Sequence, residues 1–311
     1  MSVFVFPGQG SQIKGMGREL FDSVQQFMDA ENDINDILGY SLRELCLDNR
    51  DNLMQQTQYT QPCLYVVNCL HYFQAIAAGR GPAYFAGHSL GEYSALSAAG
   101  AFGLVDGLRL VKRRGELMAQ ARQGAMAAVL GLSAAGVARV MSEHGLASID
   151  VANFNSPTQV VISGPSADIK RAGAHFTDAG ARLYVPLQVS AAFHSRYMAD
   201  AAQQFARFLA DFVFQPLRVP VVANVTARPY PAGDPSKVIP AFLVAQITRP
   251  VLWSESVSWL IRAGQSEFAE MGPGRVLTKL ANEVGQSMAA PGLIAGRQAT
   301  ELVNAANTLG A

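Results

Sequence analysis

The chain opens with short apolar runs that alternate with amphipathic stretches. Residues 3–6, Val-Phe-Val-Phe, are aromatic and β-branched and stop at Pro7-Gly8, which is typical of a buried strand. A second apolar run over 83–87 predicts another strand. Helical patterns cover residues 18–30, 61–77, 92–99 and 106–122, with Pro62 suited to a first helical turn. This alternation predicts a parallel sheet with helices on its faces.

The pattern changes near Gly124. Four strands are predicted over 125–132, 148–153, 159–163 and 182–189, and two helices over 133–144 and 168–179. Asn155-Ser156-Pro157 predicts a turn between the two middle strands. The resulting order, β-α-β-β-α-β, is the plan of a ferredoxin-like unit. We therefore expect residues 124–189 to form an inserted, ferredoxin-like small subdomain.

Beyond residue 189 the α/β pattern resumes. Helices are predicted over 199–213, 251–263 and 276–284, and strands over 219–225 and 267–271. The predicted fold class is therefore α/β. We expect an α/β-hydrolase-like large subdomain with a parallel sheet, formed by residues 1–123 and 190–311, to carry the small subdomain as an insertion.

Composition narrows the class of protein. Half of the 311 residues are apolar, enough for a large buried core. Lys plus Arg and Asp plus Glu number 24 each, so no basic excess favours a nucleic-acid or anionic-membrane partner. Three cysteines without a CxxC pair predict neither a disulfide framework nor a zinc site. The chain shows no signal-peptide pattern and no apolar run long enough to span a bilayer, so a cytoplasmic protein is expected.

The strongest local motif is Gly87-His88-Ser89-Leu90-Gly91, which fits G-x-S-x-G. It lies between a predicted strand and a predicted helix, the setting of a nucleophile elbow. Its glycines allow a tight turn that exposes the Ser89 hydroxyl, and the Leu90 amide at the helix start can donate to an oxyanion. The alternative is an ordinary strand–helix turn made of small residues.

A serine hydroxyl needs a general base to become a good nucleophile. Of the five histidines, three lie within helical patterns: His71, His144 and His175. His88 adjoins the serine, but its side chain is expected to point away from that of Ser89. His194 lies in a loop just past the predicted insertion and is the candidate base by elimination. A loop histidine with a structural role is the alternative.

Two further segments carry candidate polar groups. The glycine-rich loop of residues 7–12 completes neither a dinucleotide-binding nor a P-loop pattern, and Gln9 is the candidate for a second oxyanion amide. Arg114 follows Ser89 by 25 positions in the sequence. Beside an acyl pocket it would bind a carboxylate through a bidentate pair. The alternative is a solvated basic helix face, the interpretation we give to Lys112 and Arg113.

Seven short motifs occur in order along the chain: Phe6-Pro7-Gly8-Gln9-Gly10-Ser11-Gln12, Thr60-Gln61-Pro62, Gly87-His88-Ser89-Leu90-Gly91-Glu92, Arg114-Gly115, Asn153-Phe154-Asn155-Ser156-Pro157, Phe193-His194-Ser195 and Gly272-Pro273-Gly274. Together they resemble the malonyl-CoA:acyl carrier protein transacylase family over nearly the whole chain. Residues 190–198 and 224–229 are most similar to the free-standing, trans-acting acyltransferases of polyketide synthases.

The resemblance implies a role for each matched residue. It implies that Ser89 is the acylated serine and His194 its base, without the carboxylate of a catalytic triad. The matched residues further imply an oxyanion hole from the amides of Gln9 and Leu90, a malonyl-binding Arg114, a Gln246 carbonyl that orients the histidine, an acyl pocket lined by Phe193, and active-site neighbours His88 and Asn155.

The implied reaction is a ping-pong transfer of a malonyl group. Ser89 attacks malonyl-CoA, and the phosphopantetheine thiol of an acyl carrier protein then accepts the malonyl group, for polyketide or fatty acid synthesis. The resemblance implies no metal or redox cofactor, a monomer, and a site between the two subdomains. One alternative is an acyl hydrolase that clears stalled acyl groups from carrier proteins, although editing relatives typically lack the arginine. Another is a non-catalytic docking scaffold.

Overall fold

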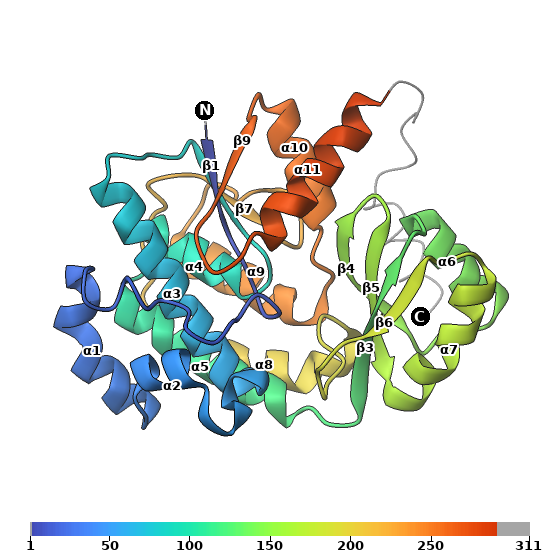
Figure 1. The fold of residues 1–311 in the computed structure, drawn as a ribbon, viewed down its shortest axis with the longest axis horizontal. Coiled ribbons are helices and arrows are strands. Elements are labelled where there is room, and N and C mark those ends of the chain that lie inside the picture. Colours follow the sequence, from blue (N-terminus) through green and yellow to red (C-terminus); the bar gives the residue numbers. More distant parts are fainter. Residues whose placement is uncertain (1, 291–311) are drawn as a thin grey trace.

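The computed structural model describes residues 2–290 and shows an α/β protein built on two sheets (Figure 1). The larger sheet has the strand order β8-β7-β2-β1-β9. Its strands are β1 (Ser2–Phe6), β2 (Tyr84–Gly87), β7 (Val221–Ala223), β8 (Arg228–Pro229) and β9 (Glu267–Glu270). Strands β9, β1, β2 and β7 are parallel, and β8 returns antiparallel to β7. The parallel sheet predicted from the sequence is confirmed.

Helices cover both faces of the larger sheet (Figure 1). Phe4 and Phe6 of β1 join a core with the first group of helices, whereas Val3 and Val5 pack against α10 and α11 on the opposite face. Burial on both faces explains why β1 is a continuous apolar run. The first group is α1 (Gln25–Leu38), α2 (Leu42–Asp48), α3 (Thr57–Ala77), α4 (Gly91–Ala98), α5 (Leu104–Gln120), α8 (Ala199–Leu209) and α9 (Pro235–Thr248); the second is α10 (Trp253–Arg262) and α11 (Val276–Ala289).

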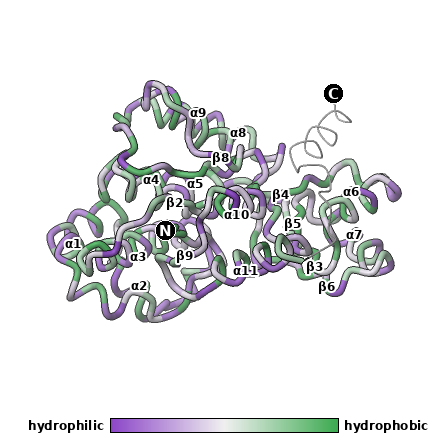
Figure 2. Tube along the Cα trace, turned by 90° about the horizontal axis from the view of Figure 1, so that it is seen from above, coloured by the Kyte–Doolittle hydropathy of each residue, from purple (hydrophilic) through white to green (hydrophobic). Residues whose placement is uncertain are grey.

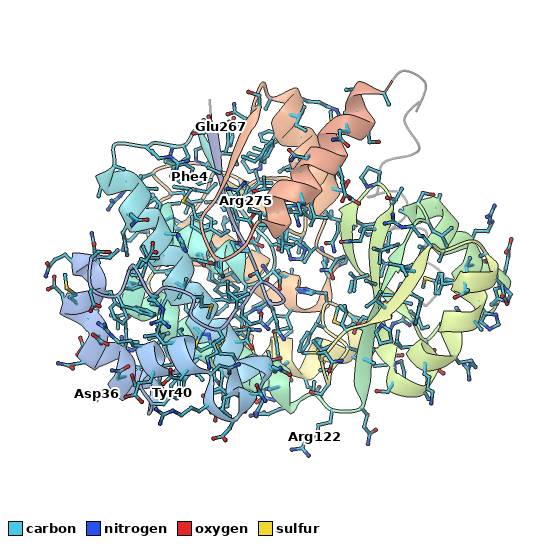
Figure 3. All side chains as sticks on the ribbon, in the orientation of Figure 1. Phe4, Asp36, Tyr40, Arg122, Glu267 and Arg275 are labelled. Atoms are coloured by element: carbon cyan, nitrogen blue, oxygen red, sulfur yellow. The ribbon has the colours of Figure 1, made fainter. Side chains whose placement is uncertain are left out.

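Figure 3 shows how side chains fill the space between these layers. Phe4 lies inside, fully buried, while Asp36 and Arg122 project from the surface. Among the described residues, no helix has both the length and the apolarity needed to cross a bilayer.

The smaller sheet is antiparallel, with the strand order β4-β5-β3-β6. Its elements are β3 (Gly124–Leu130), α6 (Ala134–Glu143), β4 (Asp150–Ser156), β5 (Gln159–Pro165), α7 (Ser166–Asp178) and β6 (Leu183–Pro186). Ala127 and Val129 of β3 face α6 and α7, whereas Met126 points into the core of the larger unit. These elements gather at one end of the molecule, away from α1 and α2 (Figure 2).

Several predicted boundaries are wrong. The helix expected over 18–30 is misplaced, because residues 18–23 form turns that follow two glycines with positive φ angles, Gly15 and Gly17, and α1 runs from Gln25 to Leu38. The helix expected from residue 61 begins at Thr57, so Pro62 lies inside it and not in its first turn. Strand β4 runs through Ser156, so only the end of the predicted 155–157 turn remains.

Two helices were not predicted, α2 and α9. Helix α9 has a clear start, because the side chain of Asp234 accepts a hydrogen bond from the Ser236 amide and Pro235 occupies the first position. Its apolar residues do not form one stripe along the helix, so the helical periodicity that predicts a helix is absent from this segment. The part of the expected segment 190–311 beyond residue 290 lies outside the described residues.

The strand–helix turn after β2 depends on close backbone contacts. A Cβ atom on Gly91 would lie 1.9 Å from the carbonyl oxygen of Phe6, and one on Gly87 would lie 2.0 Å from the Gly91 carbonyl. These glycines therefore let α4 begin directly against β1. The two elements fix where the turn residue 89 stands.

We predict that Gly91→Ala destabilises the fold by about 3 kcal/mol or more, because only a shift of backbone can relieve the clash. Thermal unfolding measures this. Gly81→Ala is the matched control, since a Cβ there meets no atom within 4 Å and Gly81 has no positive φ angle. Equal melting temperatures for the two variants would contradict the packing described for the turn.

Candidate active site

Ser89 stands at the tip of the turn between β2 and α4, with a φ angle of +51°. Its amide donates to the Oδ1 atom of Asn224 at 2.7 Å, and Asn224 Nδ2 donates to the Gly87 carbonyl at 2.6 Å. Asn224 therefore bonds the chain on both sides of His88 and holds Ser89 in a left-handed conformation, which is unfavourable for a serine. This strained strand–turn–helix geometry is that of a nucleophile elbow.

The Ser89 hydroxyl lies 2.8 Å from Nε2 of His194. The other ring nitrogen, Nδ1, lies 2.8 Å from the main-chain carbonyl oxygen of Gln246. A carbonyl only accepts, so Nδ1 carries the proton and Nε2 is free to accept the proton of Ser89. Burial, with a smaller contribution from the Arg114 charge, lowers the pKa of His194 to about 3 and keeps the ring neutral. The pair has the geometry of a nucleophile and its base.

Arg114 is buried beside this pair and comes from α5. Its Nη2 donates to Ser89 Oγ and to Gln246 Oε1, both at 3.0 Å, and its Nη1 donates to Gln61 Oε1 at 2.9 Å. The guanidinium also lies over the Tyr93 ring, 5.3 Å from its centroid. The alternative of a solvated basic helix face is wrong.

The Arg114 charge has no direct carboxylate partner. Among the ion pairs of the described residues, none includes Arg114. Burial lowers its pKa from the usual value, while Tyr93 and Glu92 act in the opposite direction. A buried cation without a paired anion, placed beside Ser89, is suited to bind a ligand that carries a carboxylate.

His88 forms a separate contact. Its Nε2 lies 2.8 Å from Oδ1 of Asn155, whose Nδ2 donates to Gln159 Oε1 at 3.1 Å. The Asn155 oxygen therefore faces the ring, so His88 Nε2 is the donor. Burial lowers the pKa of His88 as well, so the ring is neutral. As expected, the hydroxyl of Ser89 is bonded to His194 and not to His88.

The remaining predicted residues lie around the elbow. A Cβ on Gly8 would approach the His88 carbonyl oxygen to 2.4 Å, which places the loop of Gln9 directly against the elbow. The Gln9 side chain donates to Thr57 Oγ1 at 3.2 Å. Leu90 precedes α4, and Phe193 is buried next to His194.

Sequence reasoning missed four polar residues that the structure brings to the site: Gln61, Glu92, Asn224 and Tyr230. One feature of the sequence could have drawn attention to Glu92: it is the only charged residue of α4, the short helix that follows Ser89. Gln61 and Asn224 lie in segments that carry the family resemblance, but that resemblance assigned them no role, and Tyr230 lies outside those segments.

Comparison with known proteins gives consistent matches over most of the chain. The acyl transferase domain family matches residues 3–308. Polyketide biosynthesis protein ThaF of Burkholderia thailandensis is 52% identical over 301 residues, which cover 96% of this chain but only 26% of that protein. The polyketide biosynthesis malonyl CoA-acyl carrier protein transacylase BaeC of Bacillus velezensis is 49% identical over 91% of this chain and 96% of its own length.

Solved structures agree with these matches. The malonyl CoA-acyl carrier protein transacylase of Burkholderia pseudomallei superimposes with a TM-score of 0.87 at 45% identity, covering 93% of this chain and 99% of that one. A malonyl-transacylase in complex with a type II polyketide synthase acyl-carrier protein superimposes with a TM-score of 0.85 at 36% identity, covering 92% and 93%.

The low pKa of His194 predicts an unusual pH dependence. Only the neutral ring accepts the Ser89 proton, and a pKa of about 3, against the usual 6.5, keeps it neutral in weak acid. The rate of Ser89 acylation by an acyl-CoA should therefore stay level from about pH 8 down to about pH 5. Rapid-quench mass spectrometry measures this rate, with circular dichroism as a check on folding. A rate that halves near pH 6.5 in folded protein would contradict the prediction.

Proposed function

Because the chain belongs to the malonyl-CoA–acyl carrier protein transacylase family, we propose that it moves a malonyl group from malonyl-CoA, through a Ser89 ester, to the phosphopantetheine thiol of an acyl carrier protein. One observation carries the proposal: Ser89 Oγ lies within hydrogen-bonding distance of both His194 and the buried, carboxylate-free Arg114. The names of ThaF and BaeC support a role in polyketide synthesis, in which the enzyme serves its carrier proteins in trans.

In the proposed mechanism, His194 Nε2 takes the proton of Ser89 as Oγ attacks the thioester carbonyl. The amides of Gln9 and Leu90 stabilise the negative oxygen of the tetrahedral intermediate. The intermediate collapses to the Ser89 ester, and the CoA sulfur leaves with the proton from His194. The carrier-protein thiol then repeats these steps in reverse. The main-chain carbonyl of Gln246 orients the His194 ring, as a carboxylate does in a Ser-His-Asp triad.

Arg114 selects the acyl group by pairing with the free malonyl carboxylate. Phe193 lines the acyl pocket in this proposal, and His88 with Asn155 contributes polar neighbours of the site. This set of residues needs neither a metal nor a redox cofactor. A hydrolase gains no support from the relatives described above, whose names state transfer to a carrier protein or polyketide synthesis.

The same proposal extends to the architecture. The larger sheet with its helices represents an α/β-hydrolase-like subdomain, and β3 to β6 a ferredoxin-like insertion. The order β4-β5-β3-β6 supports this, because its four strands, numbered from β3 as the first, pair in the arrangement 2-3-1-4 of a split βαβ unit. Residues from both units meet at the site, since Asn155 lies on β4 and His88 on the elbow.

Malonyl-CoA alone should add one malonyl group to the protein, and Ser89→Ala should abolish the adduct, because no other hydroxyl is bonded to His194 Nε2 among the described contacts. Intact-protein mass spectrometry followed by peptide mapping tests this. Ser258→Ala is the control, because the Ser258 hydroxyl on α10 donates to the Ser254 carbonyl. An adduct that persists in Ser89→Ala would overturn the proposed function.

Arg114→Ala should lose malonyl transfer while acetyl transfer falls much less. A hydrogen bond to a charged group contributes about 1.5–3 kcal/mol, so losing a bidentate pair should reduce the malonyl-over-acetyl preference by at least about tenfold. The neighbouring Arg113→Ala is the matched control, since Arg113 pairs with Glu116 at the helix surface. Equal selectivity in both variants would mean that Arg114 does not bind the carboxylate.

Phe193 should make the enzyme prefer malonyl over methylmalonyl units by about one to three orders of magnitude, because one methyl group in a close-packed pocket changes binding by about 1–3 kcal/mol. Phe193→Ser should narrow this gap at some cost in malonyl turnover. Competition between the two CoA esters, measured on a carrier protein, gives the ratio. Equal use of both esters by the unchanged enzyme would show that Phe193 does not restrict the pocket.

A further inference from the structure

Glu92 is a buried carboxylate with no assigned task in the mechanism above. It lies in the first turn of α4 and is 1% exposed. Its Oε1 accepts from the Tyr230 hydroxyl at 2.5 Å. Its Oε2 accepts from Gln246 Nε2 at 2.5 Å and from the main-chain N–H of Asn224 at 3.2 Å. Burial raises its pKa to about 7, against the opposing effects of Tyr230, Gln246, Asn224 and Arg114. Burying this group is unfavourable, so its position needs a reason.

Glu92 is the nearest of three acceptors that set which way the Gln246 side-chain amide faces. Nε2 of Gln246 also donates to the Ser89 carbonyl at 3.0 Å and to Asn224 Oδ1 at 3.4 Å, whereas Glu92 Oε2 lies at 2.5 Å. An amide side chain has a donor end and an acceptor end, and either end fits a similar space. Oε2 of Glu92 is an acceptor, both in the ionised form and when a proton sits on Oε1. It therefore draws the Nε2 end of Gln246 toward itself. The opposite end, Oε1, is then directed at Arg114 Nη2, 3.0 Å away.

The reverse orientation of the Gln246 amide would be unfavourable. Its NH2 group would face the guanidinium of Arg114, a donor against a donor, and its oxygen would face the carboxylate of Glu92. Since Nη2 also reaches Ser89 Oγ at 3.0 Å, the orientation of this one amide influences where the cation stands relative to the nucleophile. Glu92 thus acts on the site without touching the substrate.

We propose that Glu92 is a positioning residue that sets the orientation of the Gln246 amide and, through it, holds Arg114 at the acyl pocket. The inference rests on the proposed function, because it explains how the carboxylate-binding group is kept in place. Glu92 does not exchange a proton with the substrate in this role. What it contributes is a fixed acceptor behind Gln246.

Three variants test the proposal through the ratio of malonyl to acetyl transfer. Glu92→Ala removes the acceptor and should reduce the malonyl preference by about tenfold to a hundredfold, the equivalent of one hydrogen bond to a charged group. Glu92→Gln can keep an oxygen toward Gln246 and Asn224 while its NH2 donates to the Tyr230 oxygen, so most of the preference should return. Tyr230→Phe, the matched control, removes a donor from Glu92 but leaves its contact with Gln246 in place.

Two outcomes would overturn the proposal. One is an unchanged malonyl preference in folded Glu92→Ala. The other is a Glu92→Gln variant as impaired in selectivity as Glu92→Ala, which would mean that charge and not acceptor geometry matters. If Glu92→Ala does not fold, Gln246→Met decides, because it keeps the main-chain carbonyl for His194 and removes only the amide. It should lose the malonyl preference by a similar factor, and an intact preference there would also refute the proposal.

Measurements on the enzyme without substitutions distinguish a failure of this inference from a failure of the proposed function. If it forms no malonyl adduct on Ser89, the proposed function fails. If it forms the adduct and transfers malonyl normally, yet the variants keep its selectivity, only the role of Glu92 fails.

Discussion

The buried guanidinium of Arg114 is the constraint around which the site is organised. A charge inside a protein is strongly unfavourable unless polar groups surround it. Here the groups come from separate segments, Gln61 on α3, Ser89 at the elbow and Gln246 on α9, with the Tyr93 ring beneath. Helices α3, α4, α5 and α9 must therefore be held at fixed distances, and the apolar core that they share over the larger sheet holds them.

The same charge explains why a carbonyl supports His194 where many serine enzymes use a carboxylate. A carboxylate next to the imidazole would raise the pKa of the histidine, and under the proposed mechanism it would also compete with the malonyl group for Arg114. The neutral carbonyl of Gln246 fixes the tautomer without either effect. Gln246 thus contacts His194 through its main chain and Arg114 through its side chain, so in the proposed mechanism one residue supports both the base and the carboxylate-binding group.

Local patterns predicted the parts of the structure that are local in origin. The elbow of residues 87–91 needs only a strand, two glycines and a helix, and the small antiparallel unit needs only its order of strands and helices. Longer-range packing decided the rest. Pro62 remains inside α3 because residues 60–70 around it are all buried. Helix α9 was not predicted because its apolar residues do not form one stripe.

The candidate site was predictable to a similar extent. Ser89 and the proposed oxyanion residues Gln9 and Leu90 belong to short motifs. His194 was predicted by elimination and by family resemblance, and Gln246 by family resemblance alone. The polar groups behind them, such as Asn224, come from segments far apart in the chain. Nothing in their neighbourhoods shows that they meet, because the meeting is a property of the fold and of the need to satisfy buried polar atoms.

The most direct test of this account is a crystal structure of the malonyl-enzyme. The account predicts an ester on Ser89 whose carbonyl oxygen faces the amides of Gln9 and Leu90, with the malonyl carboxylate accepting from two N–H groups of Arg114. A malonyl carboxylate that points to solvent, with Arg114 still bonded only to its protein partners, would contradict it.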